Sequence, residues 1–443
     1  MAQKSGIRGV RIGAESTFGS VSATTGLVDV SGVTFIAAEF DHAGLVDTGE
    51  QEMVQPDQAR GGYHMVPPEP VTRWSGGSRV EHRAGATLTL TQMIRGLGYG
   101  ASGITTLADM PHWKLLRTVM ADAGEPVAAS DAVSADYGET RHTPTTLASF
   151  ANAEGELIAT DLDGVVQAAQ ITDVTTDILY SPAVTNAADV SQVFYLLRTL
   201  VLDRVIKHSL LGSTVAAQVE GDGWRTLCTG GRVSNIRIFP ENGVVKIELQ
   251  VTFAHAQDAS ADADVVAGTN IDTLEPVRTD GAELHYRQVR TVISAETPTS
   301  APATLASTEV NLDNWELSIG FTLHPRGTGG NLIGFADYEV ADPVIELTLE
   351  PSDEALDALV ANDLLDRVRG RTICIPFAPL GAGDGGALLI PCAVLKSDPR
   401  PRDLAGPLVR TPTLSYGAGR NTCVDATTVQ GKGLVYFAQT RGT

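Results

Sequence analysis

The stretch from Trp224 to Phe253, WRTLCTGGRVSNIRIFPENGVVKIELQVTF, predicts two β-strands joined by a tight turn. In its first half, Ile236 and Ile238 share one face opposite polar neighbours. The pair Asn242-Gly243 supplies the turn, because glycine accepts a positive φ without steric cost. A strict alternation with a period of two indicates a second strand with one buried and one solvated face. The alternating sets are Val245, Ile247, Leu249, Val251 and Phe253 on the apolar side and Lys246, Glu248, Gln250 and Thr252 on the polar side.

The bulk composition fits a large, acidic globular protein. With 443 residues, of which 43 % are hydrophobic, the chain is long enough for two or three domains, or for one domain with a large insertion. Asp and Glu number 53 against 32 Lys and Arg, and the net charge of −21 disfavours a nucleic-acid-binding surface. Diffuse acidity ordinarily serves solubility. An acidic lumen inside a hollow assembly is a more specific interpretation of the same charge.

Cysteine use and hydropathy bear on the compartment. The four cysteines, Cys228, Cys374, Cys392 and Cys423, form no CxxC pair, so we expect buried reduced thiols and no zinc site. The opening MAQKSGIRGV lacks the apolar core of a signal peptide, and no run approaches the ~20 apolar residues of a membrane span. We therefore expect a protein that is made in the cytoplasm and has no membrane partner.

Two strand–helix units are predicted on either side of the hairpin. The first has an alternating strand at 86–91, then a helix capped by Asp109, with Pro111 in its first turn and an end at Gly124. The second has a strand at 345–349, then a helix that is capped by Ser352 and ends at Gly370. We therefore expect at least two α-helices flanking an antiparallel sheet.

Composition divides the chain into two parts. Residues 1–140 and 191–443 carry the main β domain, and residues 141–190 carry an inserted small β module with a turn at Asp161-Leu162-Asp163-Gly164. A proline-rich, polar stretch at 41–80 is expected to be a long loop or arm, and 256–300 an acidic loop. Further alternating strands are predicted at 314–323, 372–378, 387–395, 408–415 and 434–438.

No motif in the chain predicts catalysis or cofactor binding. GxGxxG occurs at 98–103 and 381–386, but neither match opens a helix after a parallel strand, so glycine turns explain both. Asp161 and Asp163 supply too few ligands for a calcium loop, and a plain turn is the favoured interpretation. GxxxxGK[ST], HExxH and GxSxG are absent, and the nine histidines fall singly. We expect no enzyme activity, no catalytic residue, no cofactor and no metal, although residues can converge in space without a sequence motif.

Two segments carry a resemblance to a known family. The run from Leu227 to Phe253, with its Cys–x–Gly–x–x–Val–Ser–x–Ile core, resembles the central hairpin of the major tail tube proteins of long-tailed, siphovirus-like bacteriophages. The segment Glu15-Ser16-Thr17-Phe18-Gly19 is similar to that family's N-terminal x-E-S-T-Y/F-G-T stretch. The strand from Asn314 matches an Asn–x–x–x–Leu/Ile strand of the family, whereas residues 41–80 and 256–300 have no counterpart.

The resemblance implies a fold and a function. The fold would be a mainly β, antiparallel sandwich or barrel of the tail tube type, and the subunits would form hexameric rings that stack into the hollow tube of the virion, with a trimer of duplicated subunits held open. Tape-measure protein and genomic DNA would occupy the lumen without specific binding until DNA ejection, and tail-tip and tail-terminator proteins would cap the tube. Glu248 and Gln250 would face the lumen. The ring-closing hairpin would present Ile236, Ile238, Val245, Ile247, Leu249, Val251 and Phe253.

Two other classes stay open. One is another tail component, such as a distal tail or baseplate hub protein, a sheath protein or a decoration protein, which share the β-rich tube fold. The other is a β-sandwich carbohydrate-binding adhesin, in which Trp74, Tyr99 and Trp224 would line a groove. Aromatic residues make up only 5 % of the chain, which disfavours the adhesin.

Overall fold

The computed structural model is mainly β. In the residues that it describes, 67 % belong to strands and 6 % to helices, and the sheets are antiparallel, which confirms the predicted fold class at this level. The described residues are 3–4, 6–19, 28–47, 50–53, 80–83, 85–97, 106–123, 130–132, 141–144, 147–150, 153–184, 193–203, 206, 208–259, 281–294, 307–327, 335–351, 370–381, 384–397, 414–418 and 433–440.

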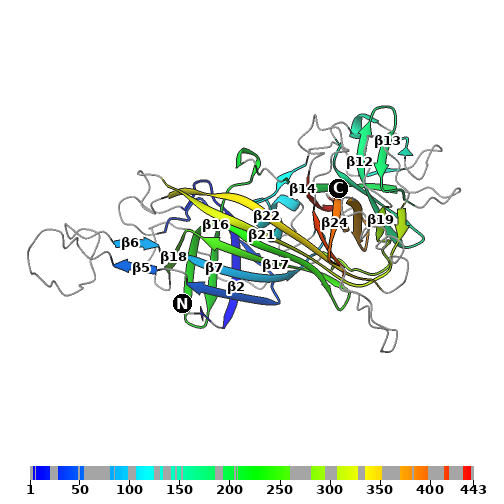
Figure 1. Cartoon of the computed structure of the whole chain (residues 1–443). Coiled ribbons are helices and arrows are strands. Elements are labelled where there is room, and N and C mark those ends of the chain that lie inside the picture. The colour runs from blue at the N-terminus through cyan, green and yellow to red at the C-terminus, as the bar shows by residue number, and fades with distance from the viewer. Residues whose placement is uncertain are drawn as a thin grey trace, which may run out of the picture.

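The predicted hairpin lies at the centre of the first sheet (Figure 1). Strands β16 (Trp224–Glu241) and β17 (Val244–Phe253) are joined by Asn242 and Gly243, whose φ angles of 55° and 84° are those that the sequence predicts for this turn. Sheet I runs in the order β1–β4–β7–β17–β16–β21–β22. Its other strands are β1 (Gln3–Lys4), β4 (His42–Asp47), β7 (Ala86–Met93), β21 (Leu312–Gly327) and β22 (Phe335–Pro351).

Strand β16 is shared by two sheets. After Gly231 it pairs with β17 and β21, whereas before that point it pairs with β15 and β18. The strand changes sheets at Gly230, whose φ is 69°, and a one-residue slip in the pairing follows between Val233 and Asn235. Sheet II runs in the order β3–β2–β15–β16–β18, with β3 (Ile36–Ala38), β2 (Ile7–Ala14), β15 (Val215–Gly221) and β18 (His255–Asp258).

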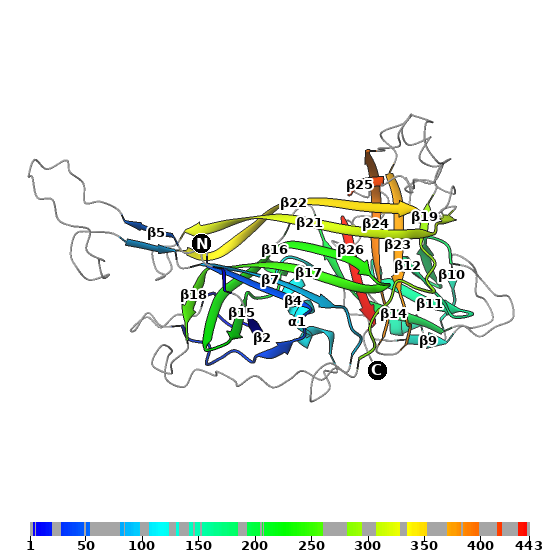
Figure 2. The ribbon, with the colours of Figure 1, turned by 90° about the horizontal axis from the view of Figure 1, so that it is seen from below.

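The two sheets and one short helix enclose a common apolar core. Figure 2 shows β2 and β15 below the strands of sheet I, with α1 (Pro111–Leu116) beside them. The apolar residues of β17 and β7 belong to the same buried cluster as those of β2, β15 and α1. Sheet II is also covered on its outer side, where residues 28–35 pack on Ala216 and Leu227. Among the described residues none covers sheet I in this way, and most side chains on its second face are half-buried or exposed.

The helix prediction was wrong in length. The helix α1 has six residues, its N-cap is Met110 without a side-chain cap, and a 3-10 turn η1 (Leu107–Asp109) precedes it. It ends early because the Thr118 hydroxyl donates to the Leu115 carbonyl and the chain then enters strand β8 (Ala121–Asp122). Residues 352–369 of the second predicted helix lie outside the described residues, and Gly370, its predicted end, begins strand β23. One α-helix is therefore present in the described part of the chain, where at least two were expected.

The module predicted at 141–190 forms strands that join the C-terminal strands through β14. A separate apolar cluster holds Ile158, Ile171 and Tyr180 of the module together with Phe194 and Leu196 of β14. Strand β14 in turn pairs with β26. The elements of this region are β9 (Ser130–Ala132), β10 (Arg141–His142), η2 (Leu147–Phe150), β11 (Leu157–Leu162), β12 (Val165–Val174), β13 (Ile178–Ser181), β14 (Val193–Leu202), η3 (His208–Leu210), β19 (Val292–Ser294), β20 (Ser307–Glu309), β23 (Gly370–Phe377), β24 (Gly386–Ser397), β25 (Leu414–Ala418) and β26 (Val435–Thr440).

Two predicted loops contain strands. The range 41–80 begins with β4 and includes β5 (Glu50–Met53), which pairs with β6 (Val80–Arg83), while residues 54–79 lie outside the described part. The range 256–300 includes most of β18 and all of β19. Leu284, which lies between β18 and β19 in the sequence, is fully buried. Its N–H donates to the Ile94 carbonyl, and its carbonyl accepts the Val245 N–H, so this segment is tied to sheet I. Acidic composition alone did not reveal these pairings.

The outer side of β22 is a partly free sheet edge. Strand β25 pairs with β22 only at residues 347–349, and among the described strands none pairs with the outer side of residues 335–346. Asp342 has a φ of 49° and Pro343 lacks an N–H, both of which interrupt regular pairing here. Val344 follows with 65 % of its surface exposed.

Candidate functional site

The polar face of sheet I is the outer side of β7, β17, β16, β21 and β22. One row across it consists of Thr91, Glu248, Arg237, Ser318 and Glu346, which are neighbours in the strand register. Strand alternation sends the apolar side chains of the same strands into the core. The structure therefore gives one sheet two chemically different surfaces.

The predicted site residues divide between these two surfaces. Glu248 and Gln250, expected to face a lumen, lie on the polar face and are half-buried. The seven residues expected in the ring-closing hairpin are all at most 2 % exposed and belong to the core: Ile236, Ile238, Val245, Ile247, Leu249, Val251 and Phe253. Their side chains pack within the chain, so among the described surfaces of sheet I the polar face and the sheet edges are the parts open to contact.

Arg237 is the central cation of the polar face. Its Nε and Nη2 donate to the two carboxylate oxygens of Glu316 at 2.9 Å each, and Nη1 donates to Glu248 at 3.2 Å. Its guanidinium carbon also lies 5.2 Å from the centroid of the Phe239 ring. The hydrogen bonds to Glu316 and then Glu248 raise the pKa of Arg237 above its ordinary value against the effect of burial. The guanidinium is therefore held in one orientation by two carboxylates.

Lys246, the second cation of this face, is held in the same way. Its Nζ lies 2.7 Å from Asp41 and also contacts Glu241. Hydrogen bonds to Asp41 and then to Glu241 raise the pKa of Lys246. Carboxylates outnumber cations among the described side chains of the polar face. Glu346 and Glu350 lie there in addition to the two carboxylates that bind Arg237 and the two that bind Lys246.

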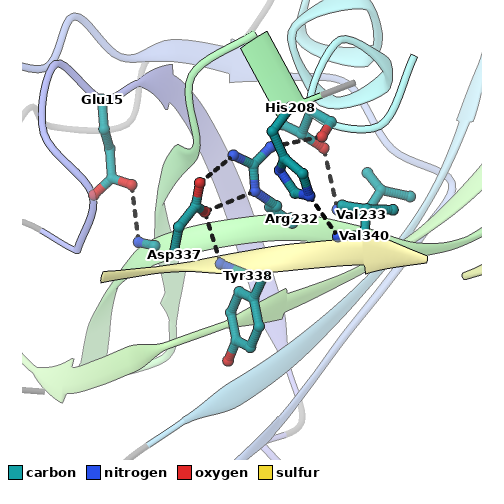
Figure 3. A network of polar contacts seen from close by, with 9 residues as sticks. Glu15, His208, Arg232, Val233, Asp337, Tyr338 and Val340 are labelled. Atoms are coloured by element: carbon teal, nitrogen blue, oxygen red, sulfur yellow. Dashed lines mark hydrogen bonds and ion pairs between the residues drawn. The ribbon is translucent and has the colours of Figure 1, made fainter. Parts of the chain in front are cut away.

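A second polar cluster, the junction, lies where β16 changes sheets (Figure 3). Arg232 is almost fully buried and donates Nε and Nη2 to the two oxygens of Asp337 at 2.9 Å each. Its Nη1 donates to the Thr118 carbonyl at 2.7 Å, and the Thr118 hydroxyl accepts the Val233 N–H. A buried guanidinium is tolerated when its donors are satisfied in this way. The junction fixes the distal part of the β21–β22 hairpin on the sandwich.

His208 adds a further contact to the junction. Its Nε2 accepts the backbone N–H of Val340 at 3.2 Å, so the neutral ring carries its proton on Nδ1. Burial, followed by the charge of Arg232, lowers the pKa of His208 below its ordinary value, although Asp337 and Glu339 act in the opposite direction. The imidazole is therefore neutral at neutral pH and serves as an acceptor for the edge of β22.

The two segments that carry the family resemblance meet at this junction. The Glu15 carboxylate accepts the backbone N–H of Gly230 at 2.9 Å. Phe18 packs edge-on against Tyr338, with ring centroids 6.1 Å apart, and lies next to Gly230. The N-terminal motif and the glycine motif thus stabilise one bend in the chain. Sequence reasoning missed Arg232 and Asp337, and the only signal was an arginine placed after two glycines in an apolar strand.

The other sequence candidates do not gather into a site. Asp163 and Gly164 have positive φ, and the Asp161 carboxylate accepts the Gly164 N–H, which makes this a hairpin turn. Trp224 is half-buried against the core, while Trp74, Tyr99 and the first GxGxxG match lie outside the described residues. In the described part of the chain, His, Cys, Asp and Glu form no group of three that could hold a metal ion.

The cysteines and helices of the described chain give no further candidate. Burial raises the pKa of the Cys374 thiol to about 12, so it stays protonated at neutral pH, and Cys228 is also buried. Within the described residues, no helix has the length and apolar content to cross a membrane. Comparison with models of protein families finds no match to this chain, and comparison with curated proteins finds none either.

Proposed function

We propose that this chain is a structural subunit of a bacteriophage tail tube, which assembles into stacked rings around a channel for DNA. The observation that carries the proposal is the polar, acid-rich face of sheet I, which is backed by a continuous core and flanked by sheet edges. The resemblance of residues 15–19 and 227–253 to tail tube proteins supports the same conclusion. A hexameric ring is the expected unit.

The physical argument concerns the sheet edges. A free edge strand exposes unpaired backbone N–H and C=O groups, and closure of sheets into a ring removes this liability. Sheet I ends at β4 and its two-residue partner β1 on one side and at β22 on the other, so a head-to-tail contact between copies joins different edges. In such a ring the polar face lines the lumen. The tape-measure protein and DNA then pass along it without specific binding.

Electron microscopy of the concentrated, purified chain tests the proposal. We expect hollow rings of constant diameter that stack into tubes, with a subunit number given by symmetry averaging. Single closed rings that never stack would instead indicate a hub protein. Particles that remain monomeric at every concentration and in mixtures with tail-tip complexes would contradict the proposal, and saturable binding in a glycan titration would favour the adhesin.

A further inference from the structure

Two cations of the polar face, Arg237 and Lys246, are already bound by carboxylates. Arg237 directs three N–H groups at Glu316 and Glu248, and Lys246 lies between Asp41 and Glu241. The two cations differ in access, because the Arg237 side chain is 36 % exposed and that of Lys246 only 13 %. Arg237 is therefore the one of these two cations that is more accessible to a large ligand.

Phosphate and carboxylate compete for the same donors of an arginine. A guanidinium recognises either anion through a pair of parallel N–H groups. In this chain the pair formed by Nε and Nη2 is filled by Glu316, and Nη1 donates one of its two N–H groups to Glu248. A phosphate approaching Arg237 thus finds the parallel pair of Nε and Nη2 already bound and meets two nearby negative charges. Since protein–DNA affinity comes largely from phosphate contacts, this arrangement removes the contact that the face would otherwise offer.

We propose that Glu316 and Glu248 act as locks on Arg237, and that these locks keep the polar face from holding duplex DNA. The inference rests on the proposed function, since a channel for DNA must let phosphates pass. The inference concerns more than the net acidic charge of the face: a carboxylate that contacts Arg237 prevents DNA binding, whereas a carboxylate elsewhere on the face does not. Loss of a lock converts a repelling face into a phosphate-binding face.

Three variants of the chain test this inference. Their binding to a short labelled DNA duplex is measured by fluorescence anisotropy at low salt, at protein concentrations too low for assembly. Glu316→Gln frees the Nε and Nη2 donors. Glu350→Gln removes the same charge from the same face without touching Arg237, because Glu350 pairs in register with Asn314. The double variant Arg237→Gln with Glu316→Gln has the net charge of the wild type but no cation to release.

We expect Glu316→Gln to bind DNA at least about tenfold more tightly than the wild type, and the gain to fall with salt by a slope of about 1 per phosphate contact. Glu350→Gln and the double variant should bind as weakly as the wild type. Equal gains in Glu316→Gln and Glu350→Gln, tight binding by the wild type, or no gain at all would each overturn the inference. If Glu316→Gln does not fold, Glu248→Gln, which frees Nη1, takes its place.

Assembly separates this inference from the proposed function. Rings in the microscope with no difference in DNA binding among the variants would leave the tube proposal standing and refute the locks. The predicted binding pattern without any ring would support the locks and refute the tube.

Discussion

At the scale of single residues, the junction shows how a buried charge can be accommodated in a β-sandwich. Arg232 is 4 % exposed, yet its guanidinium has an acceptor for Nε and for each Nη. The partners come from segments far apart in sequence, namely Asp337 of β22 and the carbonyl of Thr118 after α1. Removal of one partner from such a pair leaves an uncompensated charge, and that costs more than the pair contributes to stability.

Replacing Asp337 by Asn should therefore destabilise the fold. The amide keeps the shape of the carboxylate but loses its charge, and we expect a loss of about 2 kcal/mol, reduced from the fully buried case because the Asp337 side chain is 29 % exposed. Asp313, on β21, has an exposed side chain, so Asp313→Asn is the matched control and should change the free energy of unfolding by less than about 0.5 kcal/mol. Urea unfolding of the two variants measures the difference, and equal midpoints would contradict a role for the pair.

The buried His112 predicts a dependence of stability on pH. Its Nε2–H donates to the side-chain amide oxygen Oε1 of Gln439 at 2.7 Å, and burial lowers the pKa of His112 to about 4. In the unfolded chain His112 is protonated below about pH 6.5, whereas in the folded chain it stays neutral down to about pH 4. The contribution of the neutral His112 to the free energy of unfolding is therefore complete above about pH 6.5 and is lost as the pH falls toward 4. The loss is about 1.4 kcal/mol per pH unit over this interval.

Unfolding free energies at pH 7 and pH 5 measure this effect. We expect the wild type to lose about 2 kcal/mol more than His112→Gln, since glutamine retains a donor for Gln439 but does not titrate. Parallel pH profiles of the two proteins would show that His112 does not carry the dependence.

At the scale of elements, the bend in β16 decides how the two sheets are joined. Gly230 has a φ of 69°, and a Cβ at this position would lie 2.8 Å from that of Ala254 and 3.1 Å from the Phe18 ring. An alanine would thus meet both an unfavourable backbone conformation and a rigid neighbour. The bend, the Glu15 hydrogen bond and the packing of Phe18 form one unit.

Gly230→Ala should destabilise the protein by about 2–3 kcal/mol, because strain and overpacking add. Gly320→Ala is the matched control in sheet I, where a Cβ meets nothing within 4 Å, and it should be neutral or slightly stabilising. Thermal unfolding followed by circular dichroism compares the two. A Gly230→Ala variant as stable as Gly320→Ala would show that the bend tolerates a side chain.

Local sequence patterns predicted where the strands lie better than they predicted which strands pair with one another. The alternation in 244–253 and 314–323 fixes which side chains are buried, and Asn242-Gly243 fixes the turn, because both depend on adjacent residues. The pairing of Leu197 with Thr440 depends on residues more than 200 positions apart, and nothing in either segment encodes it locally. The same limit applies to the candidate site, since the polar face of 244–253 was predicted but the contact between the neighbouring Arg237 and Glu316 was not.

At the scale of the whole molecule, the free edge of β22 is the place to test assembly. Val344 is 65 % exposed there, and in the proposed ring it lies beside the next subunit. Val344→Lys should leave the unfolding free energy within about 0.5 kcal/mol of the wild type but should abolish rings, because a charge on an edge strand blocks strand addition. Val165→Lys, at the exposed turn of the module, should assemble normally. Rings formed by Val344→Lys would exclude this edge from the interface.

The position of β26 also sets the order of events during biosynthesis. It lies between β14 and β24, all six of its residues are buried, and its partner β14 is synthesised more than 200 residues earlier. β14 also pairs with β8, β9 and β11, but its residues 197–202 lack their β26 partner until the ribosome has delivered residue 440. Such distant pairing makes folding slow and delays it until late in translation. Nascent chains therefore complete this region only after β26 has been synthesised, and in the proposed tube a subunit would become competent for assembly no earlier than that.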